Sequence, residues 1–354
     1  MLITIISFII VLGILIFIHE LGHYITAKWA GIRVEEFALG FGPILLSHKK
    51  GETVYSLRGI PLGGFCKLTG EFPPDEDMSP EEKRIYQEAR EKGQCFDQKP
   101  AWKRLAVLFN GPLMNFLLAV LIFMLIFTIY GQIVDSTVLG EIIAGRPAAE
   151  AGFQVGDRIT AINGQEITSW EQLANIIHGS AGQELKIELL RQGQLHEVKV
   201  VPQYDESSDG GIIGIFPELV REEVGVFQAI RLGAIQGWYI LKLTIIGFYQ
   251  MLTGQISADI GGPVMIANLV GQALEIGLNS LLNLMAILSI NLGIINLVPF
   301  PALDGGRILF ILVELIRGKP VDPKKEGLAH VVGFVVLMVL MAFLVYKDLG
   351  RVLF

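Results

Sequence analysis

The sequence predicts a polytopic α-helical membrane protein with one soluble domain inserted between its membrane-spanning segments. Of its 354 residues, 52% are hydrophobic and only 18% are charged, whereas a soluble globular domain carries about 25% charged residues. The mean hydropathy of the whole chain is +0.53. Several apolar stretches are long enough to cross a bilayer, and polar, glycine-rich stretches separate them. We therefore expect about four transmembrane helices, a membrane-associated β-hairpin region and one inserted α+β domain.

Charge and cysteine content exclude two other classes of protein. The formal net charge is −7 and the isoelectric point is near 5.5, which argues against a nucleic-acid partner because nucleic acids attract basic surfaces. The two cysteines, Cys66 and Cys95, are too few for a disulfide framework. We expect both to be ordinary thiols.

The first predicted span, residues 1–27, contains the most informative motif of the chain. Its only acidic, basic or imidazole side chains are His19, Glu20 and His23, and ionisable groups inside a membrane are costly enough to indicate a function. A cleaved signal peptide is the alternative. It fits poorly, because no basic residue precedes the apolar run and no small-residue cleavage site follows it.

His19 and His23 have the spacing of two ligands of one metal ion. On a helix, residues four apart lie on the same face, one turn from each other, and the pattern HExxH sets a glutamate beside two such imidazoles. Catalytic zinc ions take three protein ligands and keep one position for water, whose proton a nearby carboxylate accepts. We therefore expect zinc at His19 and His23, with Glu20 as the general base.

Residues 28–103 are predicted to form a cytoplasmic region with a β-hairpin and a linker. Alternating apolar residues in Val54–Leu57 and in Phe65–Leu68, separated by a proline and glycines, predict two paired strands. The edge of such a hairpin can bind an extended peptide by adding it as a strand, although a plain connecting hairpin is the alternative. The linker is predicted to contain a short helix over Ser79–Lys92.

The second predicted span, residues 104–130, leads into a compact soluble domain over residues 131–205. Short strands, Gly-Asp and Asn-Gly turns, and one helix near Trp170–His178 are expected in this domain. The stretch Ala148–Gly164 is similar to that of PDZ domains in bacterial membrane and periplasmic proteases. PDZ domains bind extended chains or chain ends by strand addition, and a purely steric role is the alternative.

Residues 206–280 are predicted to form a helical region at the membrane interface. Within it, residues 230–252 are apolar enough to be counted as a span, although basic residues and glycines interrupt them. One crossing there would reverse the third span and carry its carboxylate, Asp304, to the membrane face opposite His23. The two would lie about 20–30 Å apart at 1.5 Å per helical residue, too far to share a metal ion. We therefore expect an interfacial helix.

The third predicted span, residues 281–306, ends in Asn296–Gly306, whose prolines and glycines break the helix and present one carboxylate. Because the first and third spans both end near the cytoplasmic face, Asp304 is the expected third zinc ligand, with a cap or turn residue as the alternative. Asn291 and Asn296 also lie in this span, and each buried amide needs hydrogen-bond partners. They are expected either to bind a substrate backbone or to bond neighbouring helices.

Basic residues place both connecting loops in the cytoplasm. They gather after the first span and in the loop over residues 307–327, and Lys and Arg are enriched in cytoplasmic loops. The fourth span follows over residues 328–354. Both termini and the PDZ-like domain are therefore expected on the outer side of the membrane, with the metal-site ends of the spans facing the cytoplasm.

Four motifs of this chain occur together in one known family. They are HELGH at 19–23, GFCKLTGE at 64–71, FNGPLMNF at 109–116 and NLVPFPALDGG at 296–306. Together they resemble the site-2 protease family of intramembrane zinc metalloproteases, and within it the bacterial RseP/RasP branch, of the regulator of sigma-E protease type. The resemblance covers nearly the whole chain. It departs in one respect, since better-known members can carry two tandem PDZ domains and this chain has room for one.

The resemblance implies roles for individual residues and a class of substrate. The implied ligands of Zn²⁺ are His19, His23 and Asp304, and the implied catalytic residue is Glu20. The implied substrate contacts are Gly64 and Phe65 in the β-loop, Asn296, and less strongly Asn291. Members of the family cleave membrane-embedded substrates, including anti-sigma factors.

We therefore predict a zinc-dependent intramembrane endopeptidase that cuts the transmembrane segments of single-span proteins in the lipid bilayer. A bulky outer domain would collide with the PDZ-like domain, so substrates are expected to have been shortened by another protease. Cleaved anti-sigma factors and remnant signal peptides are the examples that the resemblance suggests. Two alternatives remain. A non-catalytic membrane scaffold would leave Glu20 unexplained, and a metal transporter would leave the β-loop and the PDZ-like domain unexplained.

Overall fold

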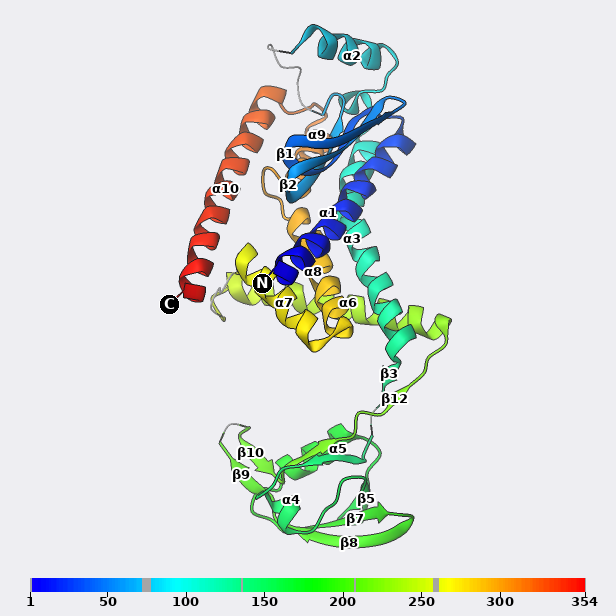
Figure 1. The fold of residues 1–354 in the computed structure, drawn as a ribbon, viewed down its shortest axis with the longest axis vertical. Helices are drawn as coiled ribbons and strands as arrows, with labels where there is room; N and C mark the ends of the chain where they lie inside the picture. Colours follow the sequence, from blue (N-terminus) through cyan, green and yellow to red (C-terminus); the bar gives the residue numbers. More distant parts are fainter. Residues whose placement is uncertain (1, 72–77, 135, 207, 257–260, 354) are drawn as a thin grey trace. The chain divides into compact units, whose positions relative to one another are not determined.

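The chain folds into two compact units (Figure 1). The computed structural model describes residues 2–71, 78–134, 136–206, 208–256 and 261–353. Unit 1 combines Met1–Phe127 with Gly225–Phe354, and unit 2 is the intervening Thr128–Val224. The soluble domain predicted between the second and third spans is therefore a separate unit, and it extends further along the chain than the predicted end at residue 205.

Unit 1 consists of helices and one antiparallel pair of long strands. Its helices are α1 (Leu2–Ala30), α2 (Pro80–Glu91), α3 (Ala101–Tyr130, which leads into unit 2), α6 (Val226–Leu252), α7 (Pro263–Ile276), α8 (Leu278–Leu297), α9 (Asp304–Arg317) and α10 (Pro323–Leu353), with a short 3-10 helix η1 (Phe96–Gln98). Five helices in the described part of the chain are long and apolar enough to cross a membrane: α1, α3, α6, α8 and α10. Four of them coincide with the four predicted spans. The fifth, α6, covers the stretch predicted to lie at the interface, and its mean hydropathy is the lowest of the five.

Helices α1 and α3 pack closely and run in opposite directions. Near the start of α3, Asn110 Nδ2 donates to the Gly22 carbonyl of α1 over 2.9 Å, and further along α3 Asn115 lies 3.2 Å from the ring of His19. A side chain at Gly22 would overlap the Asn110 backbone. The glycine of the HELGH motif therefore allows the close approach that brings α3 to the two histidines.

Helix α8 runs antiparallel to α3 and hence parallel to α1. The Ser289 hydroxyl donates to the Asn115 carbonyl over 2.7 Å. One turn later on α8, Gly293 lies against the Pro112 carbonyl, which precedes Asn115 on α3. The C-terminal ends of α1 and α8 therefore point the same way, as the predicted order of spans requires.

The strands β1 (Val34–Lys50) and β2 (Thr53–Leu68) pair with each other along their whole length. The segment 36–39 of β1 lies in the middle, because it pairs with 54–57 on one side and with 64–67 on the other. The predicted hairpin between 54–57 and 65–68 is therefore wrong, since β1 separates these two segments. Alternation in the sequence identifies strand residues correctly but does not identify their partners.

A buried apolar cluster joins α1, both strands, η1, α3 and α9 at one end of unit 1. Its largest members are Ile32, Leu68, Phe96, Leu108 and Ile311. Side chains in a close-packed core leave little freedom for the elements that carry them to move. This cluster therefore fixes the strands and α9 relative to the second half of α1, where the two histidines lie.

Helices α6 and α7 lie between unit 2 and α8 along the chain, and Figure 1 shows α6 running across the direction of α10. Gly233 of α6 packs against Val120 of α3, where an added Cβ would lie 2.9 Å from the carbonyl oxygen. The buried Asp348 near the end of α10 accepts from the Met265 N–H in the first turn of α7 over 2.9 Å. These contacts place α6 and α7 within unit 1.

Unit 2 is an α+β unit with its own core. Its strands are β3 (Gln132–Ile133), β4 (Leu139–Ile142), β5 (Arg158–Ile162), β6 (Gln165–Glu166), β7 (Leu185–Arg191), β8 (Gln194–Val200), β9 (Gln203–Asp205), β10 (Gly210–Ile212), β11 (Ile215–Pro217) and β12 (Arg221–Glu222), and its helices are α4 (Pro147–Glu150) and α5 (Trp170–His178). The main sheet has the order β6-β5-β7-β8, β4 pairs with β11, and β3 pairs with β12. Its core contains the fully buried Leu139, Leu173, Ile187 and Leu189.

Local signals predict two short helices well and miss others, among them α4 and α9. The helix expected near Trp170–His178 is α5, which begins at Ser169 because this side chain accepts from the Gln172 N–H. The helix expected over Ser79–Lys92 is α2, with a capping box at its start. The predicted loop over 307–327 is wrong in its first half, since α9 continues to Arg317. The apolar face of this short helix is difficult to recognise in the sequence, because basic residues surround it.

Candidate metal centre

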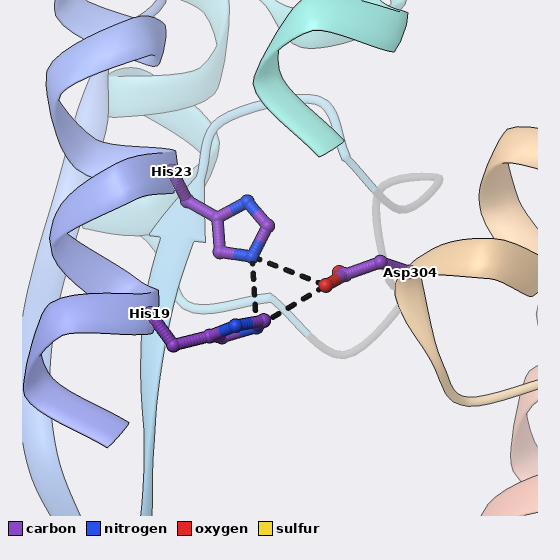
Figure 2. A group of neighbouring side chains, drawn as sticks. All are labelled: His19, His23 and Asp304. Atoms are coloured by element: carbon purple, nitrogen blue, oxygen red, sulfur yellow. Dashed lines mark hydrogen bonds and ion pairs between the residues drawn. The ribbon is translucent and has the colours of Figure 1, made fainter. Parts of the chain in front are cut away.

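Three side chains from two distant parts of the sequence meet in unit 1 (Figure 2). His19 and His23 lie on α1 and are buried, and Asp304 is the first residue of α9. The two Nε2 atoms are 3.2 Å apart, and Asp304 Oδ2 lies 3.2 Å from His19 Nε2 and 3.4 Å from His23 Nε2. The donor atoms of all three lie within 4.8 Å of one another. The structure therefore brings together the three side chains that the sequence predicts to be ligands.

The ring of His23 is held from α3. Its Nδ1 donates to the Val107 carbonyl over 2.9 Å, so the proton of the neutral ring sits on Nδ1 and the lone pair of Nε2 faces the cluster. A side chain at Gly111 would overlap the ring. The glycine of the FNGPLMNF motif thus leaves the space that His23 occupies.

The ring of His19 is held by Asn115, which lies about two turns beyond Val107 on α3. The amide nitrogen of Asn115 lies 3.2 Å from His19 Nδ1, and Oδ1 is buried with no hydrogen-bond partner among the described residues. The oxygen and nitrogen of an amide exchange places when the group turns by 180°. In that orientation His19 donates its Nδ1 proton to Asn115, Oδ1 gains the partner it lacks, and the lone pair of Nε2 faces the cluster.

Asp304 is held by the break between α8 and α9. The prolines 299 and 301 end α8, and the Ala302 N–H, in a left-handed residue, donates to His330 Nδ1 of α10 over 2.9 Å. Side chains at Gly305 or Gly306 would overlap the backbone of residues 297–301. The two glycines therefore let α9 start close against the end of α8, with the carboxylate turned toward the histidines.

The donor set fits a metal ion. Asp304 Oδ2 is buried and has no hydrogen-bond donor in the described part of the chain, and the two facing Nε2 atoms carry lone pairs when both Nδ1 atoms hold protons. A buried acceptor without a donor is costly, and three such atoms converging on one point are stabilised by a cation. Two imidazoles and one carboxylate are a usual set for catalytic zinc.

Glu20 lies beside this cluster and lines the same cavity, which has a volume of about 400 Å³. Its Cγ packs against Gly64 of β2, 3.4 Å from where a Cβ would lie. Phe65, Cys66 and Lys67 follow along the cavity wall. Burial, together with the carboxylates of Glu20 and Glu71, raises the pKa of the Cys66 thiol, so this cysteine stays protonated.

The strand segment beside Glu20 has one open edge. Residues 64–67 pair with β1 on one side, and no described strand pairs with their other side. Backbone N–H and C=O groups along such an edge can bind an extended chain. The structure thus places Gly64 and Phe65, both predicted substrate contacts, on an unpaired edge at the metal cavity.

The two asparagines of α8 separate in the structure. Asn296 lines the metal cavity, and its Nδ2 donates to the Leu292 carbonyl over 3.1 Å. Asn291 lines a different, apolar cavity of about 340 Å³ and accepts from the Thr244 hydroxyl of α6 over 3.3 Å. Asn291 therefore makes the bond between helices that was the alternative to substrate binding.

Sequence reasoning missed several supporting residues. Val107 and His330 carry no local signal, because their roles arise only from contacts with distant elements. Glu71 and Arg307 form a part-buried ion pair at the cavity, and each stands in or next to a quoted motif, GFCKLTGE and NLVPFPALDGG. A charge at the end of a motif inside an apolar region was the signal available for them.

Isolated PDZ domains of known structure match a part of the chain. The PDZ domain of an SdrC-like protein from Listeria innocua has a TM-score of 0.22 at 25% identity, covering 25% of this chain and 100% of that domain. The PDZ domain of an SdrC-like protein from Listeria monocytogenes has a TM-score of 0.21 at 25% identity, covering 23% of this chain and 86% of that domain.

Full-length relatives are similar over almost the entire sequence. The zinc metalloprotease RasP of Geobacillus kaustophilus is 36% identical over 415 aligned positions, covering 98% of each chain. The regulator of sigma-W protease RasP of Bacillus subtilis is 32% identical, again with 98% of each chain covered. A putative zinc metalloprotease of Clostridium acetobutylicum is 35% identical, covering 96% of this chain and 95% of the relative. The family model for peptidase family M50 matches residues 7–340, and the chain belongs to that family.

Proposed function

We propose that the protein is a zinc-dependent intramembrane endopeptidase that cuts transmembrane segments near the cytoplasmic face of the membrane. The observation that carries this proposal is the convergence of His19, His23 and Asp304 beside Glu20. The full-length relatives named as zinc metalloproteases support it.

His19, His23 and Asp304 would hold the zinc ion through their Nε2 and Oδ2 atoms. When bound, zinc supplies a Lewis acid for the scissile carbonyl and makes a water molecule acidic enough to attack near neutral pH. The Asn115 and Val107 contacts keep both rings in the tautomer that ligation needs.

Glu20 would act as the general base and then as the general acid. It follows His19 on α1 and faces the same cavity, so it is placed to accept a proton from the attacking water. The same carboxyl group can then give a proton to the departing amine nitrogen. Its packing against Gly64 sets it between the metal ligands and the open strand edge.

The open edge at Gly64 and Phe65 would bind the substrate as an added strand. A helix shields its own carbonyl groups, and lipid excludes water, so a transmembrane substrate must unwind before it is cut. Pairing with β2 would hold the unwound segment in an extended form beside Glu20. Asn296 lines the same cavity and would contact the bound backbone.

We place four helices across the membrane: α1, α3, α8 and α10. Because α3 and α8 are antiparallel, an even number of crossings must lie between them. Helix α7 has 14 residues, which span about 21 Å and fall short of a bilayer core of about 30 Å. Helix α6 would therefore start and end on the same side of the membrane, as expected for the predicted interfacial helix. Both termini and unit 2 then lie outside the cytoplasmic membrane of a bacterium.

Unit 2 would act as a PDZ-like selector of substrates. An apolar cavity of about 280 Å³ lies between α5 and the segment 211–216, lined by Leu173, Ile177 and Ile213. Such a groove suits the apolar end of a chain added as a strand. Substrates would be single-span proteins already shortened by another protease, with anti-sigma factors and remnant signal peptides as examples. One relative is named a regulator of sigma-W protease.

The proposal is tested by comparing membrane-protein fragments in cells. Cells carrying wild-type protein or Glu20→Gln are analysed by mass spectrometry for peptides that end inside predicted transmembrane segments. We expect such ends in wild-type cells and expect the uncut, outer-trimmed precursors to accumulate with Glu20→Gln. Identical fragment patterns in both strains would exclude an endopeptidase and would favour a scaffold or a transporter.

A further inference from the structure

We infer that a second cavity of unit 1 binds the basic cytoplasmic flank of the substrate, with Glu326 of α10 as the residue that selects it. The inference rests on the proposed function and adds a specificity site to it. The cavity, here called the flank chamber, has a volume of about 580 Å³, which exceeds the volume of the metal cavity. Its walls come from the end of β2, α2, η1, α3, α9 and α10.

The flank chamber adjoins the metal cavity. Glu71 and Arg307 line both cavities and pair with each other, so this ion pair stands on their common border. Arg307 lies one helical turn beyond Asp304, and Glu71 lies three residues beyond the end of β2. A chain that passes this pair from the metal cavity would reach the flank chamber.

The open strand edge also runs toward the flank chamber. Phe65–Leu68 line the metal cavity, and Gly70 and Glu71, which follow along the chain, line the flank chamber. A substrate added to this edge would run along β2 from one cavity toward the other. At about 3.3 Å per extended residue, the chamber would receive residues about four to six positions from the cleaved bond.

The charges of the chamber leave one acidic group available to a ligand. Three of its four described carboxylates are held by arginines: Glu71 by Arg307, Glu314 by Arg104 over 2.5 Å and Asp97 by Arg90 over 2.8 Å. Glu326, by contrast, has one ion-pair contact in the described part of the chain, with the His330 ring at 4.0 Å, and its side chain is 35% exposed. The chamber therefore has a part-buried carboxylate that a Lys or Arg side chain can approach.

The expected ligand has the complementary charge. The flank of a single-span protein on the cytoplasmic side is enriched in Lys and Arg, and this is the part of the substrate that passes the metal site toward the cytoplasm in the proposed topology. Apolar side chains such as Phe96, Phe310 and Ile311 also line the chamber. They suit the long methylene stems of these basic residues.

The test measures cleavage of three model substrates by the full-length protein in detergent. The substrates share one transmembrane segment and carry Lys-Lys, Gln-Gln or Glu-Glu in the cytoplasmic flank, four to six positions from the cleaved bond. Detergent removes the effect of flank charge on membrane insertion. For the wild type we expect kcat/KM to be about three- to tenfold higher for Lys-Lys than for Glu-Glu, as for a part-exposed ion pair, with the difference carried by KM.

Two variants of Glu326 and one control separate recognition from structure. Glu326→Gln should bring the Lys-Lys to Glu-Glu ratio close to one, and Glu326→Lys should invert it, while cleavage of the Gln-Gln substrate and zinc content stay near wild type. Glu81→Lys, an exposed change on α2 outside the chamber lining, should keep the wild-type ratio.

Each other outcome has a definite meaning. If wild type cuts all three substrates equally, or if Glu326→Gln slows all three by the same factor, Glu326 does not select the flank and the inference is wrong. If the wild type cuts none of the three substrates and also cuts no other membrane segment, the proposed function is wrong instead. The two failures are therefore distinguishable.

Discussion

Asp304 is the proposed ligand whose position depends most on the fold, because it reaches the histidines from 281 residues further along the chain than His23. Replacing it with Ala removes one of three ligands, so zinc affinity should fall by more than the roughly 10- to 100-fold that loss of a supporting residue costs. Asp304→Asn should be nearly as damaging, since an amide is a poorer zinc ligand. The measurement is zinc stoichiometry and competition with a chelator on purified protein. Unchanged affinity in Asp304→Ala would move the third ligand elsewhere.

Asn115 provides a second test at the scale of single residues. In the described part of the chain, the Asn115 side chain contacts one imidazole ring, that of His19. Asn115→Ala should therefore leave Nδ1 of His19 without its hydrogen-bond partner. Zinc affinity should fall about 10- to 100-fold, with the fold retained. Asn283→Ala is the matched control, because Asn283 bonds one turn back within α8, to Asn279. Equal zinc affinity in both variants would show that Asn115 does not orient His19.

The sequence alone predicts the proposed metal ligands but not the residues that hold them in place. HExxH predicts two ligands and a base through local helix geometry, which needs no knowledge of the fold. Asp304 could be predicted as a ligand because α1 and α8 run in the same direction, so their ends lie at the same end of unit 1. The contacts of Val107 and His330 depend on the exact packing of α3 and α10, and nothing in their local sequence encodes that packing.

At the scale of elements, the close contact between β2 and Glu20 gives a prediction about substrate binding. Gly64→Ala adds a Cβ that would lie 2.8 Å from the Ala38 carbonyl and 2.9 Å from Ile16, so the strand edge must shift. A shift of this size should lower kcat/KM about tenfold to a hundredfold, while zinc content stays unchanged. Cleavage of a model transmembrane substrate and metal analysis are measured on the same preparation.

Gly59→Ala is the control for this change. It lies in the same strand, and an added Cβ would meet Pro43 at 3.4 Å, an ordinary contact. It should therefore retain near wild-type cleavage. If Gly64→Ala and Gly59→Ala behave alike, the position of the strand edge does not matter for substrate binding.

Elements were predictable where a single local rule governs them. Apolar runs predicted α1, α3, α8 and α10, and the expected helix over Ser79–Lys92 begins at the capping residue of α2. The pairing of β1 with both halves of β2 was not predictable, since the two outer segments have similar alternation and neither identifies its partner. Helix α9 was hidden for a related reason, because its buried face is recognisable only once its packing on α1 and α3 is known.

At the scale of the whole molecule, unit 2 is predicted to restrict which substrates reach the metal. Strands β3 and β12 pair where the chain leaves and re-joins unit 1, with Ile133 opposite Arg221, so residues 134–220 can be replaced by a short flexible linker. Wild type should cut a single-span substrate with a short outer tail and spare the same substrate with a large folded outer domain. The shortened protein should cut both.

The comparison uses all four combinations of enzyme and substrate in reconstituted vesicles. Cleavage of the short-tailed substrate by the shortened enzyme shows that its metal site is intact. Equal cleavage of both substrates by the wild type would exclude the size restriction without touching the protease activity.

The most direct test of the metal centre measures zinc and cleavage on the same purified samples of wild type, Glu20→Gln and His23→Ala. Wild type should hold about one zinc per chain and cut a pre-trimmed single-span substrate. Glu20→Gln should hold the same zinc and show no measurable turnover, because it keeps the ligands and loses the base. His23→Ala should lose both zinc and activity. Near wild-type cleavage by Glu20→Gln, or full zinc content in His23→Ala, would contradict the account.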